Sequence, residues 1–506
     1  MDVIQDSLKG QQLPVAVAAI VCCFALMVYH TRRKKSKIIS IPGYPLIGNM
    51  FDMDVKVILD RLAHYKEVYG NVFHLQVFSH KFLHVSDPKL VREIMAKRPK
   101  VFKRGIALEA MANKLHYLPF GLFHAHDAQI WGKVKKLTAP AFSKQNLNNM
   151  SRILYDEALS FVDRINELSL VDADIDFPRE AARLTTGVIN KVAFGDEQVD
   201  YFIGQQFYED VNITLKILLE AALFPFPEWI WQLTPMYKNE LLAREADVRF
   251  TKAAQEVIDR KRVQHASMDE DTKKELHSLI DIMLRQDDVQ DLEILANVKT
   301  FYVAGSDTTS VTISWALYLL LQNPDCVAKI RTEAAKFFGA GLGHKSTQEI
   351  GDALMELQYT TAVFKEAVRL YPVGPLIFLD FLDRSEAVEL SDGVVIEPDR
   401  TVLLQTWTCH LDEVSFPEAK KFVPARWLTQ DKALLGQMEN AFLGFGAGTR
   451  ACPGMNLALR EGALALATLF HHFDLKFACP VEEIKVNYLF TMQPNKLPLR
   501  ATKRVV

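Results

Sequence analysis

The chain has 506 residues, of which 49% are hydrophobic and 24% charged, so it can form one large core or two ordinary ones. Its formal net charge of −3 gives no global electrostatic basis for binding nucleic acid or another acidic polymer. Its six cysteines include no CxxC pair, so they do not support a disulfide framework or a zinc ribbon, and they favour a reducing compartment.

The N-terminal segment contains an uncharged apolar run, Leu13 to Tyr29, followed directly by the basic residues 31–37. A run of about 17–20 apolar residues has the length needed to cross a bilayer. A cleaved signal peptide is the alternative, but there the basic residues precede the apolar stretch. Residues 1–30 are therefore predicted to hold a retained transmembrane signal anchor, with everything after the basic cluster on the cytoplasmic side.

A proline-rich segment follows at residues 41–50, IPGYPLIGNM. Its two prolines and two glycines forbid a continuous helix and favour a stiff, extended connector. A hinge between membrane and globular body and a plain linker both fit this pattern. We assign residues 31–50 to a basic stop-transfer segment and hinge. Residues 51–506 are assigned to a single domain, because no convincing boundary follows.

The remaining chain is predicted to be mainly α-helical with small β-sheets. Residues 71–87 alternate and turn, which predicts a β-hairpin. Residues 151–168 and 249–266 have the apolar period of helices, and short strands are expected within residues 393–405. The polar stretch 265–275 is predicted to be a solvated loop.

One predicted helix is unusually long, running from about Asp291 to Gln322, where Asn323-Pro324 ends it. About 30 residues correspond to roughly 45 Å, far above the usual three turns. Its centre, AGSDTTS, places Gly305 and Asp307 in an apolar surround, although glycine costs about 1 kcal/mol within a helix. A carboxylate near a core is rare without a partner or a function. A tolerated polar patch on a core helix is the alternative.

The segment KEAVRLYP places Glu366 and Arg369 three residues apart on one helical face, and Pro372 ends that helix. Most such pairs are exposed and contribute little to stability. A second segment, FVPARW, carries Arg426 between a proline and a tryptophan. We expect a buried carboxylate held by two guanidinium groups, which would be a rigid structural cluster.

The loop FGAGTRACPG, residues 445–454, concentrates three glycines and a proline around Arg450 and Cys452. It also satisfies the dinucleotide fingerprint GxGxxG/A, but no clean strand precedes it and no acidic residue follows at the required distance. A buried inert cysteine is the other alternative. Glycines allow close backbone approach, and an electropositive loop favours the thiolate. A lone thiolate suits a single metal already held by another group, and haem iron fits that description.

Together these segments resemble the cytochrome P-450 superfamily of haem-thiolate monooxygenases over essentially everything after the anchor. FGAGTRACPG matches the FxxGxRxCxG haem loop of that family, AGSDTT its AGxDT motif and KEAVR its ExxR motif. FVPARW matches the arginine segment that completes the ExxR cluster, and PGYPLIGN resembles the hinge of microsomal members. The resemblance implies the cytochrome P-450 fold, with a haem-thiolate catalytic domain at residues 51–506.

The resemblance also implies roles for individual residues, with haem b as the cofactor. It assigns Asp307 and Thr308 as the catalytic acid–alcohol pair that steers protons to bound dioxygen. Glu366, Arg369 and Arg426 are implied to be structural. The implied cofactor contacts are Cys452 as axial iron ligand, Arg450 at a propionate, Ala304 and Gly305 beside dioxygen, and Phe445, Gly446, Gly448 and Gly454 of the loop.

Two motifs depart from the family pattern. WxxxR, whose arginine holds a propionate, reads WGKVK here, so Lys135 replaces the arginine and loses its planar fork. Trp131 and Lys135 are kept as expected propionate contacts. The common HRD reads HLD at residues 410–412, a change that the sequence does not explain.

The reaction implied is insertion of one oxygen atom of O2 into an organic substrate. The implied partners are an NADPH-dependent diflavin reductase, with cytochrome b5 as a further candidate, and membrane lipid; nucleic acid is not expected. Apolar pocket segments favour a lipophilic substrate, such as a fatty acyl chain, sterol or terpenoid. The expected location is the endoplasmic reticulum membrane, single-pass, with the catalytic domain facing the cytosol. Alternatives are an O2-independent haem-thiolate isomerase or dehydratase and a non-catalytic haem-binding sensor.

Overall fold

The computed structural model of the chain describes residues 38–105, 115, 120–125, 127–171, 174–195, 200–224, 226, 228–383 and 386–505. The predicted membrane anchor at residues 1–30 lies outside these ranges. The chain divides into two compact units, residues 1–40 and residues 41–506. Within the described ranges, no helix combines the length and the apolar character that crossing a bilayer requires.

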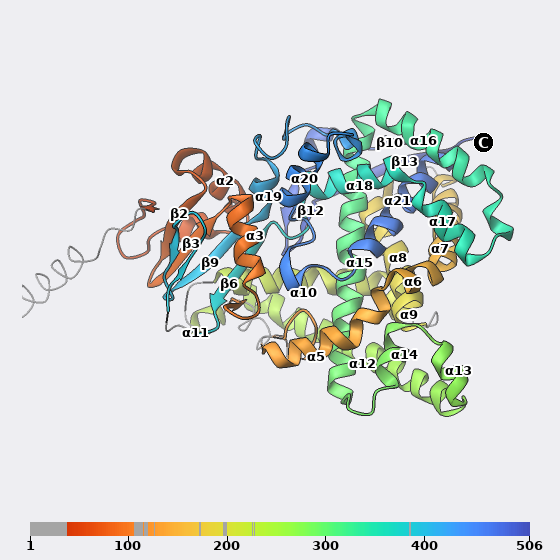
Figure 1. Cartoon of the computed structure of the whole chain (residues 1–506), viewed down its shortest axis with the longest axis horizontal. Helices are drawn as coiled ribbons and strands as arrows, with labels where there is room; N and C mark the ends of the chain where they lie inside the picture. The colour runs from red at the N-terminus through yellow and green to blue at the C-terminus, as the bar shows by residue number, and fades with distance from the viewer. Residues whose placement is uncertain are drawn as a thin grey trace, which may run out of the picture. The chain divides into compact units, whose positions relative to one another are not determined.

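The larger unit is mainly helical, and its long helix α15 (Asp291–Leu321) runs through the helical part (Figure 1). Among the described residues, the other helices of nine residues or more are α2 (Ile58–Tyr69), α3 (Pro88–Ala96), α5 (Ala128–Thr138), α7 (Ser151–Ser169), α8 (Phe177–Ile189), α10 (Gln205–Leu223), α12 (Pro235–Ala266), α16 (Pro324–Gly339), α17 (Thr347–Met355), α18 (Gln358–Leu370), α20 (Lys432–Ala441) and α21 (Met455–His472). Shorter helices are α6 (Lys144–Asn149), α9 (Asp200–Ile203), α11 (Glu228–Trp231), α13 (Glu270–Glu275), α14 (Leu279–Leu284) and α19 (Thr406–His410).

The strands form small sheets beside these helices (Figure 1). The main sheet contains, in order, β2 (Val72–Val77), β3 (His80–Val85), β9 (Arg400–Gln405), β6 (Leu376–Phe381) and β4 (Phe102–Arg104). β3 and β9 pair in parallel, and the other neighbouring pairs are antiparallel. The smaller sheets contain β10 (Phe473–Phe477), β13 (Pro498–Lys503) and β5 (Ile175–Asp176), then β11 (Val486–Tyr488) with β12 (Met492–Pro494), and β7 (Val388–Glu389) with β8 (Val395–Ile396).

Most of the predicted elements are confirmed. The hairpin is β2–β3, with Phe73 opposite His84, and the helical periods of residues 151–168 and 249–266 fall within α7 and α12. The loop predicted at residues 265–275 is wrong in part, because residues 270–275 form α13. The side chain of Asp269 accepts hydrogen bonds from two backbone amides and so caps this helix. Acidic residues in its first turn and basic ones in its last suit the helix dipole.

Helix α15 begins and ends where local chemistry dictates. Gln290 and Glu293 form a capping box at its N-terminus, and the chain turns at Asn323 before Pro324. The helix is buried along most of its length because other elements surround it. The Thr185 hydroxyl of α8 donates to the Ser306 carbonyl at 2.7 Å, and the Trp315 indole donates to Met492 of β12 at 2.8 Å.

The core lies on both sides of α15. One apolar cluster joins it to α7, α18 and α21, with Phe161, Phe364 and Leu466 fully or almost fully buried. A second cluster joins it to α10 and α12 through Phe207, Phe250 and other aromatic rings. These contacts fix α15 and α21 relative to each other, and a cavity lies between them.

Candidate functional site

A cavity of about 290 Å³ separates the centre of α15 from the loop that precedes α21. Ala304, Gly305 and Thr308 of α15 line one wall, and Cys452 lines another. Ala304 and Cys452 are both exposed to this cavity although they lie inside the helical part. The two motifs that the sequence singled out, AGSDTT and FGAGTRACPG, therefore face one space.

The cysteine loop owes its shape to its glycines. Gly446 and Gly448 have φ angles of +73° and +70°, a region that side chains rarely tolerate. A Cβ atom at Gly448 would lie 2.8 Å from the Met95 carbonyl oxygen of α3, so only glycine allows this close approach. The Cys452 amide donates to the Phe445 carbonyl at 2.8 Å and closes the loop.

The predicted loop residues thus divide into two groups. Phe445, Cys452 and Gly454 line the cavity, whereas Gly446 and Gly448 shape the loop behind it. Burial raises the pKa of the Cys452 thiol, while hydrogen bonds from the backbone amides of Gly454 and Met455 lower it. Such amides stabilise a thiolate and orient it as a metal ligand. In the ranges that the structure describes, no cluster of three or more His, Cys, Asp or Glu residues could hold a metal ion by itself.

Three arginines, Arg98, Arg104 and Arg450, lie close enough to repel one another. Burial lowers the pKa of Arg98 to about 10, and burial together with the charge of Arg98 lowers that of Arg450 to about 10. Arg104 is affected most, since burial and both neighbouring guanidinium groups hold its pKa well below the usual range. Three cations in a buried space are stable only when anions accompany them.

No carboxylate of the described residues pairs with these arginines. Arg98 Nε, Arg104 Nε and Arg450 Nη1 are buried and have no hydrogen-bond partner there. Arg450 Nη2 donates to the Ala125 carbonyl at 2.7 Å, and its guanidinium lies 4.6 Å from the centre of the Trp131 ring. The Arg104 guanidinium stacks on Phe123, which lines the cavity, at 3.5 Å. The cluster therefore fits a bound anion beside the cavity.

Of these three arginines the sequence interpretation included only Arg450. Arg98 and Arg104 lie at the ends of the basic run KRPKVFKR, residues 97–104, and this run was the available signal. The structure brings the run to the cysteine loop, where the Thr449 hydroxyl donates to the Arg98 carbonyl at 2.7 Å. Lys135 Nζ donates to the Thr449 carbonyl at 2.9 Å and lies 5.0 Å from the Trp131 ring centre. Neither Trp131 nor Lys135 lines the cavity.

The residues predicted at the centre of α15 face two different spaces. Thr308 lines the cavity, and its hydroxyl donates to the Ala304 carbonyl at 2.7 Å. A Cβ atom at Gly305 would lie 2.6 Å from the Ile189 side chain, so this glycine also permits α8 to approach. Asp307 points away from the cavity into a second, smaller pocket.

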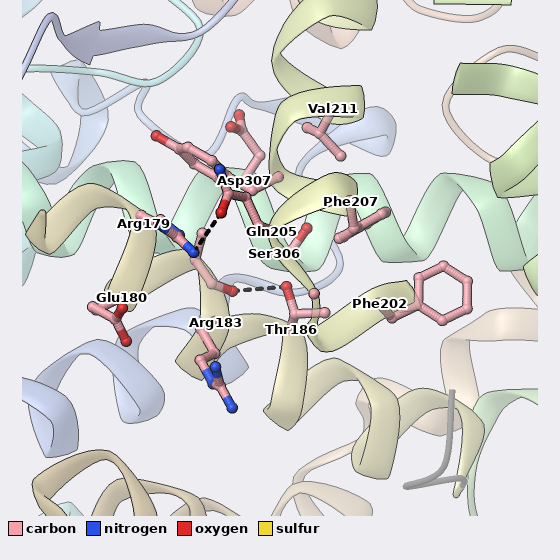
Figure 2. Close-up of a pocket in the computed structure, with 13 residues that line it drawn as sticks. Arg179, Glu180, Arg183, Thr186, Phe202, Gln205, Phe207, Val211, Ser306 and Asp307 are labelled. Carbon is pink, nitrogen blue, oxygen red and sulfur yellow. Dashed lines mark hydrogen bonds between the residues drawn. The ribbon is translucent and has the colours of Figure 1, made fainter. Parts of the chain in front are cut away.

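Figure 2 shows this second pocket, of about 40 Å³, between α8, α10 and α15. Arg179 and Gln205 line it and are joined by a hydrogen bond of 2.9 Å, while Arg183 is exposed. Asp307 is 7% exposed, and burial raises its pKa to about 7, although the nearby Thr491 hydroxyl lowers it. Asp307 Oδ2 and Thr491 Oγ1 have no hydrogen-bond partner of normal geometry within the described structure. Thr491 lines the main cavity, so Asp307 lies between that cavity and the pocket.

The structure brings Glu366, Arg369 and Arg426 together in a fully buried cluster. Arg369 binds both carboxylate oxygens of Glu366, at 2.8 and 2.9 Å, and Arg426 Nε binds Oε1 at 3.0 Å. The Trp427 indole donates to the second oxygen at 2.9 Å. Arg369 Nη1 donates to two backbone carbonyls and Nη2 to a third, so the charges in this cluster are well paired.

His410 connects this cluster to the cysteine loop, a contact that the sequence did not reveal. Its Nδ1 lies 2.9 Å from the Arg369 carbonyl, and its Nε2 accepts from the Leu443 amide at 2.8 Å. Nδ1 therefore carries the proton, because Nε2 is an acceptor. Burial and the Arg369 charge lower the pKa of His410 to about 3, so the ring stays neutral.

These features define the class of the site. A lone cysteine ligand suits a cofactor that carries its own metal. The apolar cavity suits a flat, apolar body, and the three guanidinium groups suit carboxylates on that cofactor. Haem has these properties, and Cys452 with Arg98, Arg104 and Arg450 would hold it. The site is that of a haem-thiolate protein.

Comparison with known proteins identifies the family. Residues 40–500 match the Cytochrome P450 family model, and the chain belongs to this family. It is 25% identical to 5-OH-xanthotoxin synthase of Pastinaca sativa over 95% of this chain and 96% of the relative. It is 26% identical to costunolide synthase of Cichorium intybus over 91% of this chain and 90% of that relative. A self-sufficient cytochrome P450 monooxygenase of Oidiodendron maius is 27% identical over 93% of this chain and 43% of that protein.

The chain is therefore an oxidoreductase of a family that uses haem with an axial cysteine thiolate. At this level its activity is that of a cytochrome P450 monooxygenase, in agreement with the named relatives. The mainly helical structure with small sheets agrees with the same fold.

Proposed function

We propose that this enzyme inserts one oxygen atom of O2 into a lipophilic substrate of the fatty acyl, sterol or terpenoid kind. Electrons come from a separate NADPH-dependent reductase. The proposal rests on the position of Thr308, which lines the α15 wall of the cavity that Cys452 also lines. The preceding residue, Asp307, has a pKa raised to about 7 and can therefore carry a proton near neutral pH.

Haem bound through Cys452 supplies the redox centre at which O2 is activated. The residues of the chain would bind this cofactor and orient its ligand. The amides of Gly454 and Met455 would orient the Cys452 sulfur as a ligand, and Arg98, Arg104 and Arg450 would neutralise the haem propionates. Ala304 and Gly305 line the cavity with little side-chain volume, which would leave space between α15 and a bound cofactor.

Asp307 and Thr308 control protons. Reducing O2 to one inserted oxygen atom and one water consumes two electrons and two protons. A carboxyl group whose pKa is about 7 can both donate and recover a proton near neutral pH. The Thr308 hydroxyl can pass hydrogen bonds within the cavity, and the pocket in Figure 2 leads from Asp307 towards the exposed Arg183.

The walls of the cavity favour an apolar substrate. Phe123, Phe301 and Phe490 line it together with aliphatic side chains. Phe301 stacks on Phe142 at 5.5 Å, and Phe123 meets Phe490 edge to face at 6.2 Å. No lysine or arginine of the described residues lines this cavity, so none of them is placed there to bind a substrate carboxylate. Burying an unpaired charge is costly, which favours uncharged substrates.

We propose that the reductase docks at the basic surface of α5. Lys135 and Lys136 are exposed on α5, whereas Lys133 pairs with Glu293 at 3.0 Å. We further propose that residues 1–30 anchor the enzyme in the endoplasmic reticulum membrane with the catalytic domain in the cytosol. Deleting residues 1–30 should weaken membrane association and leave haem incorporation intact.

The deciding experiment replaces Thr308 by alanine in the haem-loaded enzyme supplied with reductase and substrate. We expect less product per NADPH and more hydrogen peroxide, because the hydroxyl that passes the proton is missing. Thr312→Ala is the matched control, since Thr312 lines the same cavity one turn further and its hydroxyl binds the Thr308 carbonyl. Unchanged coupling in Thr308→Ala contradicts this role. Product formation by the wild type without O2 and reductant overturns the monooxygenase assignment.

A further inference from the structure

The turn between β11 and β12 places one polar side chain at the wall of the cavity. Residues 489–491 connect the two strands, and Phe490 and Thr491 both line the cavity. Thr491 is 5% exposed, and its hydroxyl oxygen is buried without a hydrogen-bond partner of normal geometry among the described residues. Such a group costs free energy in the folded chain unless something binds it. No step assigned to Asp307 and Thr308 uses this hydroxyl.

The turn is held in an unusual conformation. Phe490 has a φ angle of +99°, a region that residues other than glycine rarely occupy. The Leu489 amide donates to the Thr491 carbonyl at 3.1 Å and closes the turn. The Met492 amide donates to the Val373 carbonyl at 2.9 Å and fixes the turn beside the cavity. Strained conformations persist where the surrounding structure imposes them, and they are typical of ligand-binding sites.

Three other threonine hydroxyls of the cavity wall already have acceptors. Thr308 and Thr312 donate to carbonyls of their own helix, α15, at 2.7 and 2.9 Å. Thr185 of α8 donates to the Ser306 carbonyl at 2.7 Å. Thr491 differs from these three, because its hydroxyl group still has hydrogen bonds to make.

The groups near Thr491 favour an uncharged ligand. Burial raises the pKa of Asp307 to about 7, although the Thr491 hydroxyl lowers it. Glu461 lines the cavity, and burial raises its pKa well above the usual range. Both shifts show that this apolar space disfavours charge. A ligand hydroxyl can donate as well as accept, so it can pair with Thr491 whether Asp307 is protonated or ionised.

We propose that Thr491 positions the substrate by binding an uncharged hydroxyl group on an otherwise apolar molecule. The rings of Phe123, Phe301 and Phe490 contact the apolar remainder of that molecule. The inference rests on the proposed function and narrows its substrates from lipophilic molecules in general to lipophilic alcohols. A hydroxyl group held at the turn also restricts which carbon atoms reach the opposite part of the cavity, so the same contact determines the position of oxidation.

The first test needs no ligand. Thr491→Val removes the hydroxyl and keeps the shape of the side chain. Because this hydroxyl has no partner of normal geometry among the described residues, the melting temperature of the haem-loaded, substrate-free protein should stay the same or rise. A clear fall overturns the proposal, since it shows that the hydroxyl already has a structural partner.

The second test compares alcohols with hydrocarbons of the same skeleton: dodecanol with dodecane, menthol with menthane, and cholesterol with cholestane. Each is titrated from detergent micelles into the haem-loaded protein, and the absorption of the bound haem reports binding. At least one alcohol should bind the wild type about two- to tenfold more tightly than its hydrocarbon, the contribution of one hydrogen bond. Thr491→Val should abolish this preference, and Thr491→Ser should keep it.

Thr312→Val is the matched control, because Thr312 lines the same cavity but its hydroxyl is already bound to the Thr308 carbonyl. This variant should keep the preference for the alcohol. The proposal is overturned if no alcohol binds the wild type more tightly than its hydrocarbon, or if the preference survives in Thr491→Val. Both outcomes come from binding alone, so they are distinct from failure of the proposed function, in which the wild type forms no product that depends on O2.

Discussion

Two groups of buried charges in this enzyme differ in how well they are paired. In the cluster of Glu366, Arg369 and Arg426, both carboxylate oxygens and the guanidinium groups have partners within the protein. Around the cavity, Arg98 and Arg104 each have a buried nitrogen that has no partner among the described residues. In the first group, ion pairs that form during folding offset the cost of removing the charges from water. In the second group, a bound ligand would have to offset that cost.

Whether a buried charge has a partner thus distinguishes a structural charge from a functional one. A paired buried charge makes its contribution as soon as the chain folds, and its loss should damage the fold. An unpartnered one destabilises the folded chain until an anion or a proton arrives. Asp307 and Glu461 belong to the second kind, since each has a raised pKa and a buried carboxylate oxygen with no hydrogen-bond partner of normal geometry among the described residues.

The largest effect is expected for Glu366→Ala. This change leaves two buried guanidinium groups without their carboxylate, and breaking such a network costs about 3–5 kcal/mol. Chemical denaturation and the yield of haem-loaded protein should both show severe loss. Asp271→Ala, which removes an exposed ion pair with Lys274, should have no measurable effect. A stable, haem-loaded Glu366→Ala protein would show that this cluster does not hold the fold.

Neutralising an arginine of the cavity group should have opposite effects on the empty and the loaded protein. Arg98→Gln or Arg104→Gln relieves repulsion, so the free energy of unfolding of the haem-free form should rise. Haem binding should weaken by about 1.5–3 kcal/mol, the usual contribution of a hydrogen bond to a charged group. Haem titration and denaturation of the haem-free protein measure the two effects. Equal affinities for wild type and both variants would remove these residues from the haem site.

The raised pKa of Asp307 predicts the sign of a pH dependence. The folded chain keeps this proton up to about pH 7, whereas an unfolded carboxyl ionises near its ordinary value of 3.8. The folded chain binds more protons between these values, so the free energy of unfolding should fall as pH rises through this interval. Asp307→Asn should flatten this part of the curve. Identical slopes for wild type and variant would show that Asp307 ionises normally.

The smallest effect is expected for Lys135→Ala. Lys135 is exposed and donates to the Thr449 carbonyl of the cysteine loop, whereas the cavity arginines are buried. Haem retention should decrease slightly, and less than in Arg98→Gln, when haem transfer to an acceptor protein is timed. A larger loss than in Arg98→Gln would show that Lys135 is a main propionate contact.

Much of this arrangement was predictable because local sequence determines it. The length of α15 follows from an apolar run between a capping box and Asn323-Pro324, and the loop around Cys452 follows from its glycines. The contact of Glu366 with Arg369 and Arg426 was expected from their motifs and is present. In each case the residues that predict the feature are neighbours in the sequence or belong to recognisable motifs.

The remaining features depend on contacts between distant segments. Arg98 and Arg104 belong to a basic run that resembles ordinary surface charge until the fold carries it to the loop 350 residues later, where Thr449 binds the Arg98 carbonyl. Glu461 follows Arg460 on α21, and nothing local shows which of the two faces the cavity. The hydrogen bond from the Leu443 amide to His410 and the second pocket at Asp307 also join segments that are far apart in the sequence.

The most direct test of the central claim, that the cavity holds haem through the Cys452 thiolate, is the carbon monoxide difference spectrum of the reduced protein. The wild type should show the red-shifted carbonyl band of a thiolate-ligated haem. Cys452→Ser should lose this band while much of the fold, followed by circular dichroism, survives. A Cys452→Ser protein that keeps the red-shifted band would contradict the account.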